Sequence, residues 1–265
     1  MAGAIRQAGE LRGAGWETGR RVRLKIVPGA PGSGIVINGV PATPEYARAG
    51  GNCTMLVKGK TKVKMVEHFL SACCGLGVSD IVVMSEEMPI ADGSALPFVH
   101  LLQRLGFYTG IRNQKRVLRL SVPVGVEEKG RFVIALPVEK GLRISCIFSL
   151  PGTERMQFFS CQVSPVFFVN NIAPARTFGP GSEALVRRWR LRFKLEKSGS
   201  WLFPVNWRFP DEPCRHKVLD LIGDLALIGW GLQAEIVAFN PGHRLNLRLV
   251  RMLAEMAKKE VISGG

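Results

Sequence analysis

The order helix, strand, glycine-containing turn and helix occurs twice in this chain, once in each half. The first copy covers residues 67–106 and the second copy covers residues 215–256. A repeated order of this kind predicts an α+β fold built from two tandem units of similar design. We expect the junction near Gly110–Lys115, which gives a first unit of residues 1–112 and a second unit of residues 113–265.

The individual elements follow from hydrophobic periodicity and from Gly and Pro at their boundaries. Helices are predicted at residues 63–78, 97–106, 214–229 and 246–260. Strands are predicted at residues 22–28, 34–39, 54–59, 80–84, 115–126, 131–138, 142–150 and 234–239. Residues 240–245 are expected to form a turn, which puts His243 just before the last helix.

The composition is that of a globular protein with a substantial core, since 46% of the 265 residues are hydrophobic and 22% are charged. The net charge of +15 favours anionic partners: nucleic acid, an anionic membrane surface or a phosphorylated substrate. Two segments alternate basic and apolar residues and are predicted to be strands with one basic face. These are residues 20–26, with Arg21, Arg23 and Lys25, and residues 187–194, with Arg188, Arg190, Arg192 and Lys194. We expect both faces to be solvated surface.

The six cysteines form no C-x-x-C pair, and the adjacent Cys73 and Cys74 lie in an apolar helical segment. We therefore expect reduced core residues rather than a disulfide framework. The N-terminal residues contain no apolar segment typical of a signal peptide, and charges interrupt the apolar run at residues 219–239. These features predict a soluble, cytoplasmic protein.

Two common catalytic or nucleotide-binding motifs are missing from the sequence. The glycine-rich segment GAGWETG, residues 13–19, has no clear strand before it and no Walker lysine after it. A G-x-S-x-G motif of serine hydrolases is also absent. The chemistry must therefore come from other residues.

One predicted helix, CRHKVLDLIGDLALIG, carries His216, Asp220 and Asp224 at intervals of four. Residues four apart lie on the same face of a helix, so this face presents an imidazole and two carboxylates. His216 and Asp220 are candidate metal ligands, with His68 as a third from the matching helix of the first half. The spacing fits an ordinary solvated stripe as well. His100 has no acidic neighbour and is expected to be structural.

Five separated stretches together resemble the zinc-dependent UDP-3-O-acyl-N-acetylglucosamine deacetylase family of lipid A synthesis. They are VEHFLSAC with GLGV, PIADGSALPFV, APARTFG, RFPDE with RHKVLDLIGDLALIG, and GHRLN, in the family's order over residues 66–246. The resemblance implies that each unit layers a β-sheet against two α-helices, and that the units face one another around the active site. It implies removal of the acetyl group by water activated at Zn²⁺.

The resemblance also implies roles for single residues. His68, His216 and Asp220 match the family's zinc ligands. Glu67 matches the general base that deprotonates the attacking water, and His243 matches the group that protonates the leaving amine. Three further residues match supporting groups: Thr177 for the oxyanion, Asp224 for orienting His243, and Lys217 for the substrate, where it would suit a diphosphate.

Substrate recognition is less closely matched than the chemistry. Phe148 resembles a family aromatic residue that stacks on uracil, and Phe178 is a second candidate for contact with the substrate. Trp16–Glu17 and Lys64–Met65 depart from the family's usual residues. Pro180 to Arg208 lacks the family's L-G-G-S-x-D-N segment, in a region that forms the acyl-chain passage in the family.

Three hypotheses follow, and the first is favoured. The chain is a zinc-dependent deacetylase of UDP-3-O-acyl-N-acetylglucosamine; or it keeps the zinc site and takes a different acyl substrate; or it is a non-catalytic basic relative that binds anionic surfaces. Under the first hypothesis the partner is the UDP-linked acylated glucosamine, with no nucleic acid. Transient contact with an anionic membrane surface is compatible with the charge, and the chain is expected to be a monomer.

Overall fold

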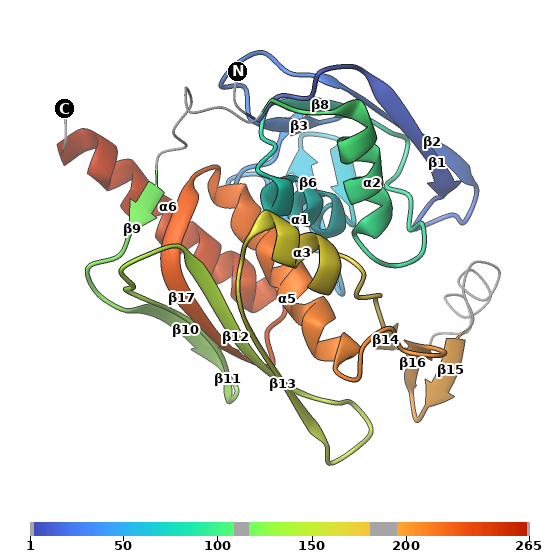
Figure 1. Cartoon of the computed structure of the whole chain (residues 1–265), viewed down its shortest axis with the longest axis vertical. Helices are drawn as coiled ribbons and strands as arrows, with labels where there is room; N and C mark the ends of the chain where they lie inside the picture. Colours follow the sequence, from blue (N-terminus) through green and yellow to red (C-terminus); the bar gives the residue numbers. More distant parts are fainter. Residues whose placement is uncertain (1–2, 109–116, 181–194, 264–265) are drawn as a thin grey trace.

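The computed structural model describes residues 3–108, 117–180 and 195–263, which form a mixed α+β protein (Figure 1). The described helices differ widely in length, and the last is the longest. They are α1 (Glu67–Leu76), α2 (Leu96–Leu105), α3 (Pro165–Asn171), α5 (Glu212–Leu225), which a short 3₁₀ turn (Ala226–Ile228) extends, and α6 (His243–Ser263).

One larger sheet comes from the first third of the chain and has the order β1-β2-β8-β3-β4. Its strands are β1 (Gly9–Ala14), β2 (Arg21–Pro28), β8 (Ile81–Met84), β3 (Ile35–Ile37) and β4 (Val40–Pro41). Neighbouring strands are antiparallel except for β3 and β8, which are parallel. In β2 the basic side chains are exposed and Val22, Leu24 and Ile26 are buried, so the predicted solvated basic face is confirmed.

The other larger sheet comes from the later part of the chain and has the order β10-β11-β17-β12-β13, with β9 also paired to β17. Its strands are β9 (Val117–Arg119), β10 (Val124–Glu128), β11 (Arg131–Leu136), β12 (Leu142–Ser149), β13 (Met156–Gln162) and β17 (Gly231–Phe239). Strand β17 runs parallel to β12 and β9 and antiparallel to β11.

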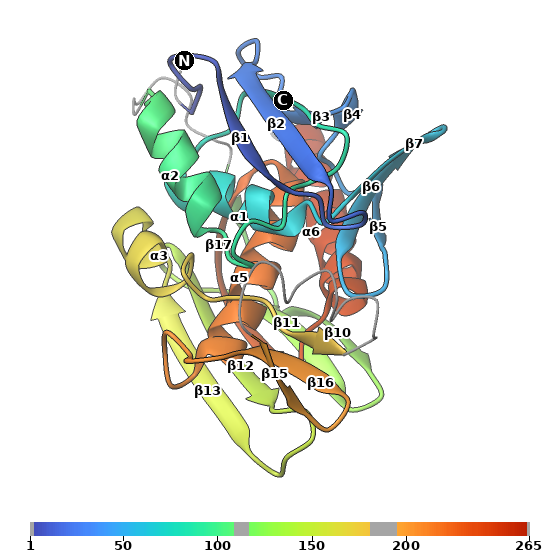
Figure 2. The same cartoon turned by 90° about the vertical axis from the view of Figure 1, so that its right-hand side faces the viewer.

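Two smaller sheets flank the molecule. One consists of β5 (Ala47–Ala49), β6 (Thr54–Lys58) and β7 (Thr61–Lys64), and the other of β14 (Gly179–Pro180), β15 (Leu195–Ser198) and β16 (Trp201–Pro204). Figure 2 shows the β6–β7 hairpin extending away from the body, and Figure 1 shows β14, β15 and β16 beyond one end of α5.

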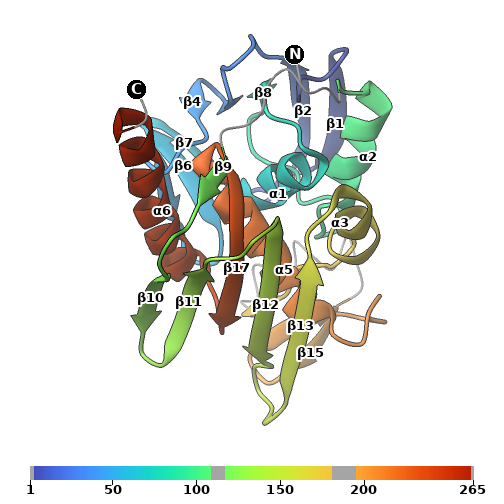
Figure 3. The same ribbon diagram turned by 60° about the vertical axis from the view of Figure 1, so that its left-hand side comes forward.

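The long helices lie between the two larger sheets (Figures 1 and 3). Helix α2 packs against β1, whereas α5 packs against β12 and β13, and α6 packs against β10 and β11. Helices α1 and α5 contact one another in the centre. All but one residue of α1 and most residues of α5 are buried, so a polar side chain in either helix points into the protein rather than into solvent.

The predicted helix at residues 63–78 starts four residues too early. Residues Thr61–Lys64 form β7, and α1 begins only at Glu67. Between them Met65 has φ 65°, a left-handed conformation that interrupts any continuous helix. This break places Glu67 and His68 in the first turn of α1.

Three other expectations on local structure were wrong. A strand, β1, does precede the glycine-rich segment 13–19, but it is an edge strand with few apolar residues. It forms a hairpin with β2 that closes where Gly15 N donates to Arg20 O, so no phosphate-binding helix follows. Strands β4, β5, β13, β14, β15 and β16 and helix α3 were not predicted, and the described part of the predicted strand at residues 115–126 forms two strands, β9 and β10. His243 is the first residue of α6 rather than part of a turn, because the carbonyl of Gly242 accepts the amides of Leu245 and Asn246.

Two further expectations concern side chains. The six cysteines, all within the described residues, are reduced thiols, and all but Cys74 are buried, as predicted. The predicted basic strand at residues 187–194 lies outside the described residues. Among the described helices, none is both long and apolar enough to cross a membrane.

Candidate active site

The α1–α5 interface brings distant polar residues together because the two helices approach unusually closely. Gly223 of α5 lies against the start of α1, and a Cβ at this position would be 2.1 Å from the Glu67 carbonyl oxygen. Only glycine allows this approach without moving one helix. The interface therefore holds Glu67 and His68 directly over the polar face of α5.

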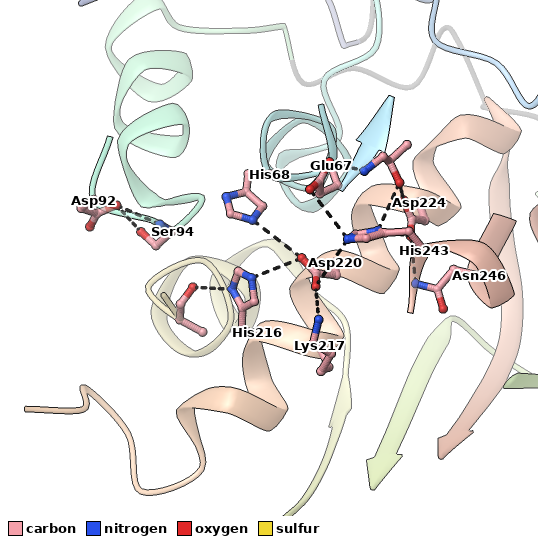
Figure 4. A network of polar contacts seen from close by, with 12 residues as sticks. Glu67, His68, Asp92, Ser94, His216, Lys217, Asp220, Asp224, His243 and Asn246 are labelled. Carbon is pink, nitrogen blue, oxygen red and sulfur yellow. Dashed lines mark hydrogen bonds and ion pairs between the residues drawn. The ribbon is translucent and has the colours of Figure 1, made fainter. Parts of the chain in front are cut away.

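The three predicted metal ligands meet at this interface (Figure 4). His68, from α1, and His216 and Asp220, from α5, are all buried and offer ligand atoms that lie within 4.8 Å of one another. The Asp220 Oδ1 atom is 3.3 Å from His216 Nε2 and 3.7 Å from His68 Nε2. The predicted convergence of the two helices on one site is thus present in the structure.

The chemical state of these groups suits a metal ion. His216 Nδ1 lies 3.1 Å from the Ala175 carbonyl, so it carries the hydrogen and leaves the Nε2 lone pair facing Asp220. Burial lowers the pKa of His216 to about 3, which keeps the imidazole neutral. Burial also disfavours the charged form of Asp220, but positive charge on the surrounding groups, Lys217 among them, holds its pKa well below the usual range. Two imidazoles and a carboxylate form a donor set that catalytic zinc sites use.

Glu67 lies beside this cluster and is buried, but it borders the pocket described below. Its Oε2 atom accepts a hydrogen bond from Thr54 N at 2.9 Å, and its Oε1 atom is 3.8 Å from His243 Nε2. Burial raises the pKa of Glu67 to about 7, against the opposing effect of the neighbouring histidines. A carboxyl group with such a pKa can accept and release a proton near neutral pH.

His243 faces Glu67 from the start of α6 and is held from behind by Asp224. The His243 Nδ1 atom lies 2.9 Å from Asp224 Oδ2, and Asn246 Nδ2 donates to the same oxygen at 2.8 Å. Burial lowers the pKa of His243, but the charges of Asp224 and Glu67 outweigh burial and raise it to about 9. The predicted pairing of Asp224 with His243 is therefore present.

Glu67, His68, His216, Asp220 and His243 form the floor of a pocket of about 410 Å³. Thr177, Lys217, Phe148 and Phe178, all predicted as site residues, line it. Thr177 is held by its amide, which donates to the Gly93 carbonyl at 2.7 Å. Lys217 Nζ donates to Asp220 Oδ2 at 2.7 Å.

One side of the pocket is lined by Phe148, Phe178 and Trp201, and Phe203 stacks on Phe178 outside this lining; we call these four residues the aromatic wall. Phe178 is central, with ring centroids 5.3 Å from Phe148, 5.4 Å from Phe203 and 6.1 Å from Trp201. The Lys217 ammonium lies 5.2 Å from the Phe178 ring centroid. Strand β16 thus supplies apolar surface directly beside the polar cluster.

Sequence reasoning missed several residues that support the site. Thr54 and Asn246 bond to Asp224 from β6 and α6. The buried Glu212 binds the Arg176 guanidinium through both carboxylate oxygens, at 2.8 and 3.0 Å, which ties the Thr177 loop to the start of α5. For Arg176, Glu212 and Asn246 the available signal was their position in RTFG, PDE and HRLN, close to predicted site residues, whereas Thr54 lies in none of these motifs. His100 lies exposed on α2, away from these contacts.

Known proteins match this chain over nearly its whole length. The family of UDP-3-O-acyl N-acetylglycosamine deacetylases, LpxC, matches residues 3–255. A UDP-3-O-acyl-N-acetylglucosamine deacetylase of Legionella pneumophila is 38% identical, covering 92% of this chain and 86% of the relative. Proteins of the same name from Solibacter usitatus and Colwellia psychrerythraea are 32% and 36% identical, covering 96% and 90% of this chain and 92% and 85% of the relatives. The sequence motifs, the buried His2Asp cluster and these matches agree: the chain belongs to the LpxC family of UDP-3-O-acyl N-acetylglycosamine deacetylases.

Proposed function

We propose that the pocket over the α1–α5 interface is the active site, and that His68, His216 and Asp220 hold the zinc ion on which this family depends. As a family member, the chain removes the acetyl group of UDP-3-O-acyl-N-acetylglucosamine in lipid A synthesis. The observation that carries the assignment of the site is the convergence of two imidazoles and a carboxylate within 4.8 Å, all buried at the floor of a pocket.

Bound zinc lowers the pKa of water and polarises the carbonyl under attack. Side chains of the protein carry out the proton transfers and stabilise the oxyanion. Glu67 accepts the proton of the attacking water, because its Oε1 atom faces the cluster and its pKa lies near 7. The Thr54 amide holds the other oxygen of Glu67, so the base keeps one orientation.

Formation of the tetrahedral intermediate requires a donor for the oxyanion, and its collapse requires a proton for the leaving amine. We assign the first role to the Thr177 hydroxyl at the pocket wall. His243 Nε2 delivers the proton, since Nδ1 is engaged by Asp224 and the raised pKa keeps the ring protonated. The Asp224 carboxylate balances the charge of the imidazolium.

The nucleotide and acyl parts of the substrate would meet the remaining lining residues. Lys217, Arg131 and Arg244 line the pocket and suit a diphosphate. Phe148 and Phe178 are proposed to contact the substrate through the aromatic wall. A second candidate function, the same hydrolysis with a different acyl chain, is favoured by one observation: residues 180–208 lack the family's L-G-G-S-x-D-N segment.

We further propose that the chain consists of the two tandem units inferred from its sequence, residues 1–112 and 113–265. In support, one larger sheet uses strands from residues 9–84 and the other uses strands from residues 117–239. The active site would then lie between the units, with Glu67 and His68 from the first and the other site residues from the second. A monomeric state and transient membrane contact stay predictions.

The test is a deacetylation assay on UDP-3-O-acyl-N-acetylglucosamine with metal-loaded protein. We expect activity that is lost on chelation and returns with zinc, and that is abolished in the double variant His216→Ala, Asp220→Ala. His100→Ala is the matched control, because this histidine lies exposed on α2. Activity that survives in the double variant would refute the assignment of the ligands.

The other hypotheses give different outcomes in the same experiment. Zinc binding without turnover of this substrate, but with turnover of analogues carrying another acyl chain, would favour the second candidate. Binding to nucleic acid or anionic surfaces through the basic side chains would weaken steeply with added salt, whereas turnover at a buried site would not.

A further inference from the structure

Thr54, the first residue of β6, contacts both proton-transfer groups of the site although the sequence motifs do not include it. It is fully buried. Its backbone serves the start of α1: its amide donates to Glu67 Oε2 at 2.9 Å and its carbonyl accepts from Val66 N at 3.2 Å. Its hydroxyl oxygen lies 2.5 Å from Asp224 Oδ1 and 3.1 Å from His243 Nδ1.

The chemistry of these groups fixes the direction of each hydrogen bond. The Asp224 carboxylate only accepts, so the Thr54 hydroxyl donates its single hydrogen to Oδ1. The other oxygen of Asp224 faces His243 Nδ1, which therefore carries a hydrogen. This hydrogen lies between Asp224 Oδ2 and the lone pair of Thr54 Oγ1. Nε2 is left as the ring nitrogen that faces Glu67.

We propose that Thr54 is a positioning residue that fixes the general base, Glu67, and the general acid, His243, relative to one another. This inference rests on the proposed function. Its amide fixes Glu67, and its hydroxyl fixes both the Asp224 carboxylate and the plane of the His243 ring. The two proton-transfer groups come from different helices, α1 and α6. Thr54 sets the separation between them, which is 3.8 Å from Glu67 Oε1 to His243 Nε2.

A purely structural role for Thr54 makes different predictions. If the Thr54 hydroxyl only filled a hydrogen-bonding requirement of the fold, its loss would lower the yield of folded protein. Its loss would also lower activity to the same degree whether or not His243 is present. A positioning residue acts through His243, so its contribution to turnover must vanish when that imidazole is removed.

The first experiment compares variants at this position. Thr54→Val keeps the shape and the backbone amide but loses the hydroxyl. We expect kcat to fall about 10–100-fold, the range for loss of an outer partner of a catalytic group, with KM and zinc content nearly unchanged. Thr54→Ser restores the hydroxyl and should recover most of the lost kcat. Ser71→Ala is the control, because the Ser71 hydroxyl is also fully buried but has no hydrogen-bond partner among the described residues.

The second experiment repeats Thr54→Val in a His243→Ala background, using the residual turnover. There the substitution should change kcat by less than about 2-fold, since the group through which Thr54 acts is gone. An equal fold-loss in both backgrounds, wild-type kcat in Thr54→Val, or failure of Thr54→Ser to recover activity would each overturn the proposal.

Failure of the proposed function can be told apart from failure of this inference. A wild-type, zinc-loaded protein that does not hydrolyse the substrate refutes the function. In that case ¹⁵N NMR of the His243 ring still tests Thr54. The inference expects a protected Nδ1 hydrogen in the wild type that exchanges faster in Thr54→Val, and an unchanged exchange rate would overturn it.

Discussion

The α1–α5 interface and the aromatic wall border the same pocket, but they are held in different ways. At the interface, polar groups are buried and fixed by partners on several elements, as Asp224 is by Thr54, His243 and Asn246. The close contact at Gly223 leaves no room for adjustment. The wall is built from ring contacts between Phe148, Phe178, Trp201 and Phe203.

This difference suggests that the α1–α5 interface and the aromatic wall have different functions. Polar networks in a buried interface have one good arrangement, because an unpaired buried group is costly. Aromatic contacts are less directional and tolerate changes of shape. We therefore expect substitutions in the interface to affect turnover, and substitutions in the wall to affect which substrate binds. Four substitutions test this division, ordered by the size of their expected effect.

Glu67→Gln should have the largest effect. The amide oxygen can still accept from the Thr54 amide, so the geometry is kept, but the side chain can no longer take a proton. Loss of a general base lowers kcat about 10²–10⁴-fold. Steady-state kinetics should show this loss at unchanged zinc content. A variant that retains wild-type kcat would show that Glu67 is not the base.

Thr177→Val should lower kcat about 10²–10³-fold, the usual result of removing one oxyanion donor. KM should change little, because the bond to the hydroxyl forms only as charge develops on the carbonyl oxygen. Thr177→Ser is the matched control and should retain most of the activity. Equal losses in kcat for the Val and Ser variants would point to packing rather than hydrogen bonding.

Gly223→Ala tests the close approach of the two helices. The new methyl group would collide with the Glu67 carbonyl, and overpacking of this kind costs about 1–3 kcal/mol. Denaturant unfolding should show this decrease in the free energy of unfolding, together with weaker zinc binding. Gly242→Ala, where a Cβ would meet no atom within 4 Å, is the control for stability. A fully stable Gly223→Ala protein would mean that α1 and α5 can separate without penalty.

Trp201→Leu should have the smallest effect on turnover. Trp201 lines the pocket, and its ring centroid lies 6.1 Å from that of Phe178. We expect kcat within about 3-fold of the wild type and a larger change in KM, since uniform binding is lost. Measuring KM for substrates with acyl chains of different length would show whether the wall sets this preference. A large loss of kcat would remove the distinction between wall and interface.

The catalytic and metal-binding residues could be predicted from the sequence, but the residues that support them largely could not. The i, i+4 spacing of His216, Asp220 and Asp224 was sufficient to place them on one helix face. His68 and Glu67 followed from the repeated element order and the family motifs. Thr54 could not be predicted, because its role depends on β6 meeting α1, α5 and α6, which no local pattern encodes.

The errors in the predicted fold also come from features that a local sequence pattern does not encode. Helix α1 was extended too far because periodicity cannot detect the left-handed Met65. Strand β13 was missed because it is an edge strand with exposed Met156 and Phe158, which hides the alternation of buried and exposed residues. Helix α3 was missed because it is only 7 residues long and shows little periodicity, although Ser164 and Pro165 are a typical helix start.

The central claim is that one zinc ion is held between α1 and α5. Anomalous diffraction at the zinc absorption edge from crystals of the zinc-loaded protein tests it most directly. We expect a single strong peak between His68, His216 and Asp220 that is absent from crystals of the Asp220→Ala protein. A zinc peak elsewhere in the protein, or one that persists without the Asp220 carboxylate, would contradict it.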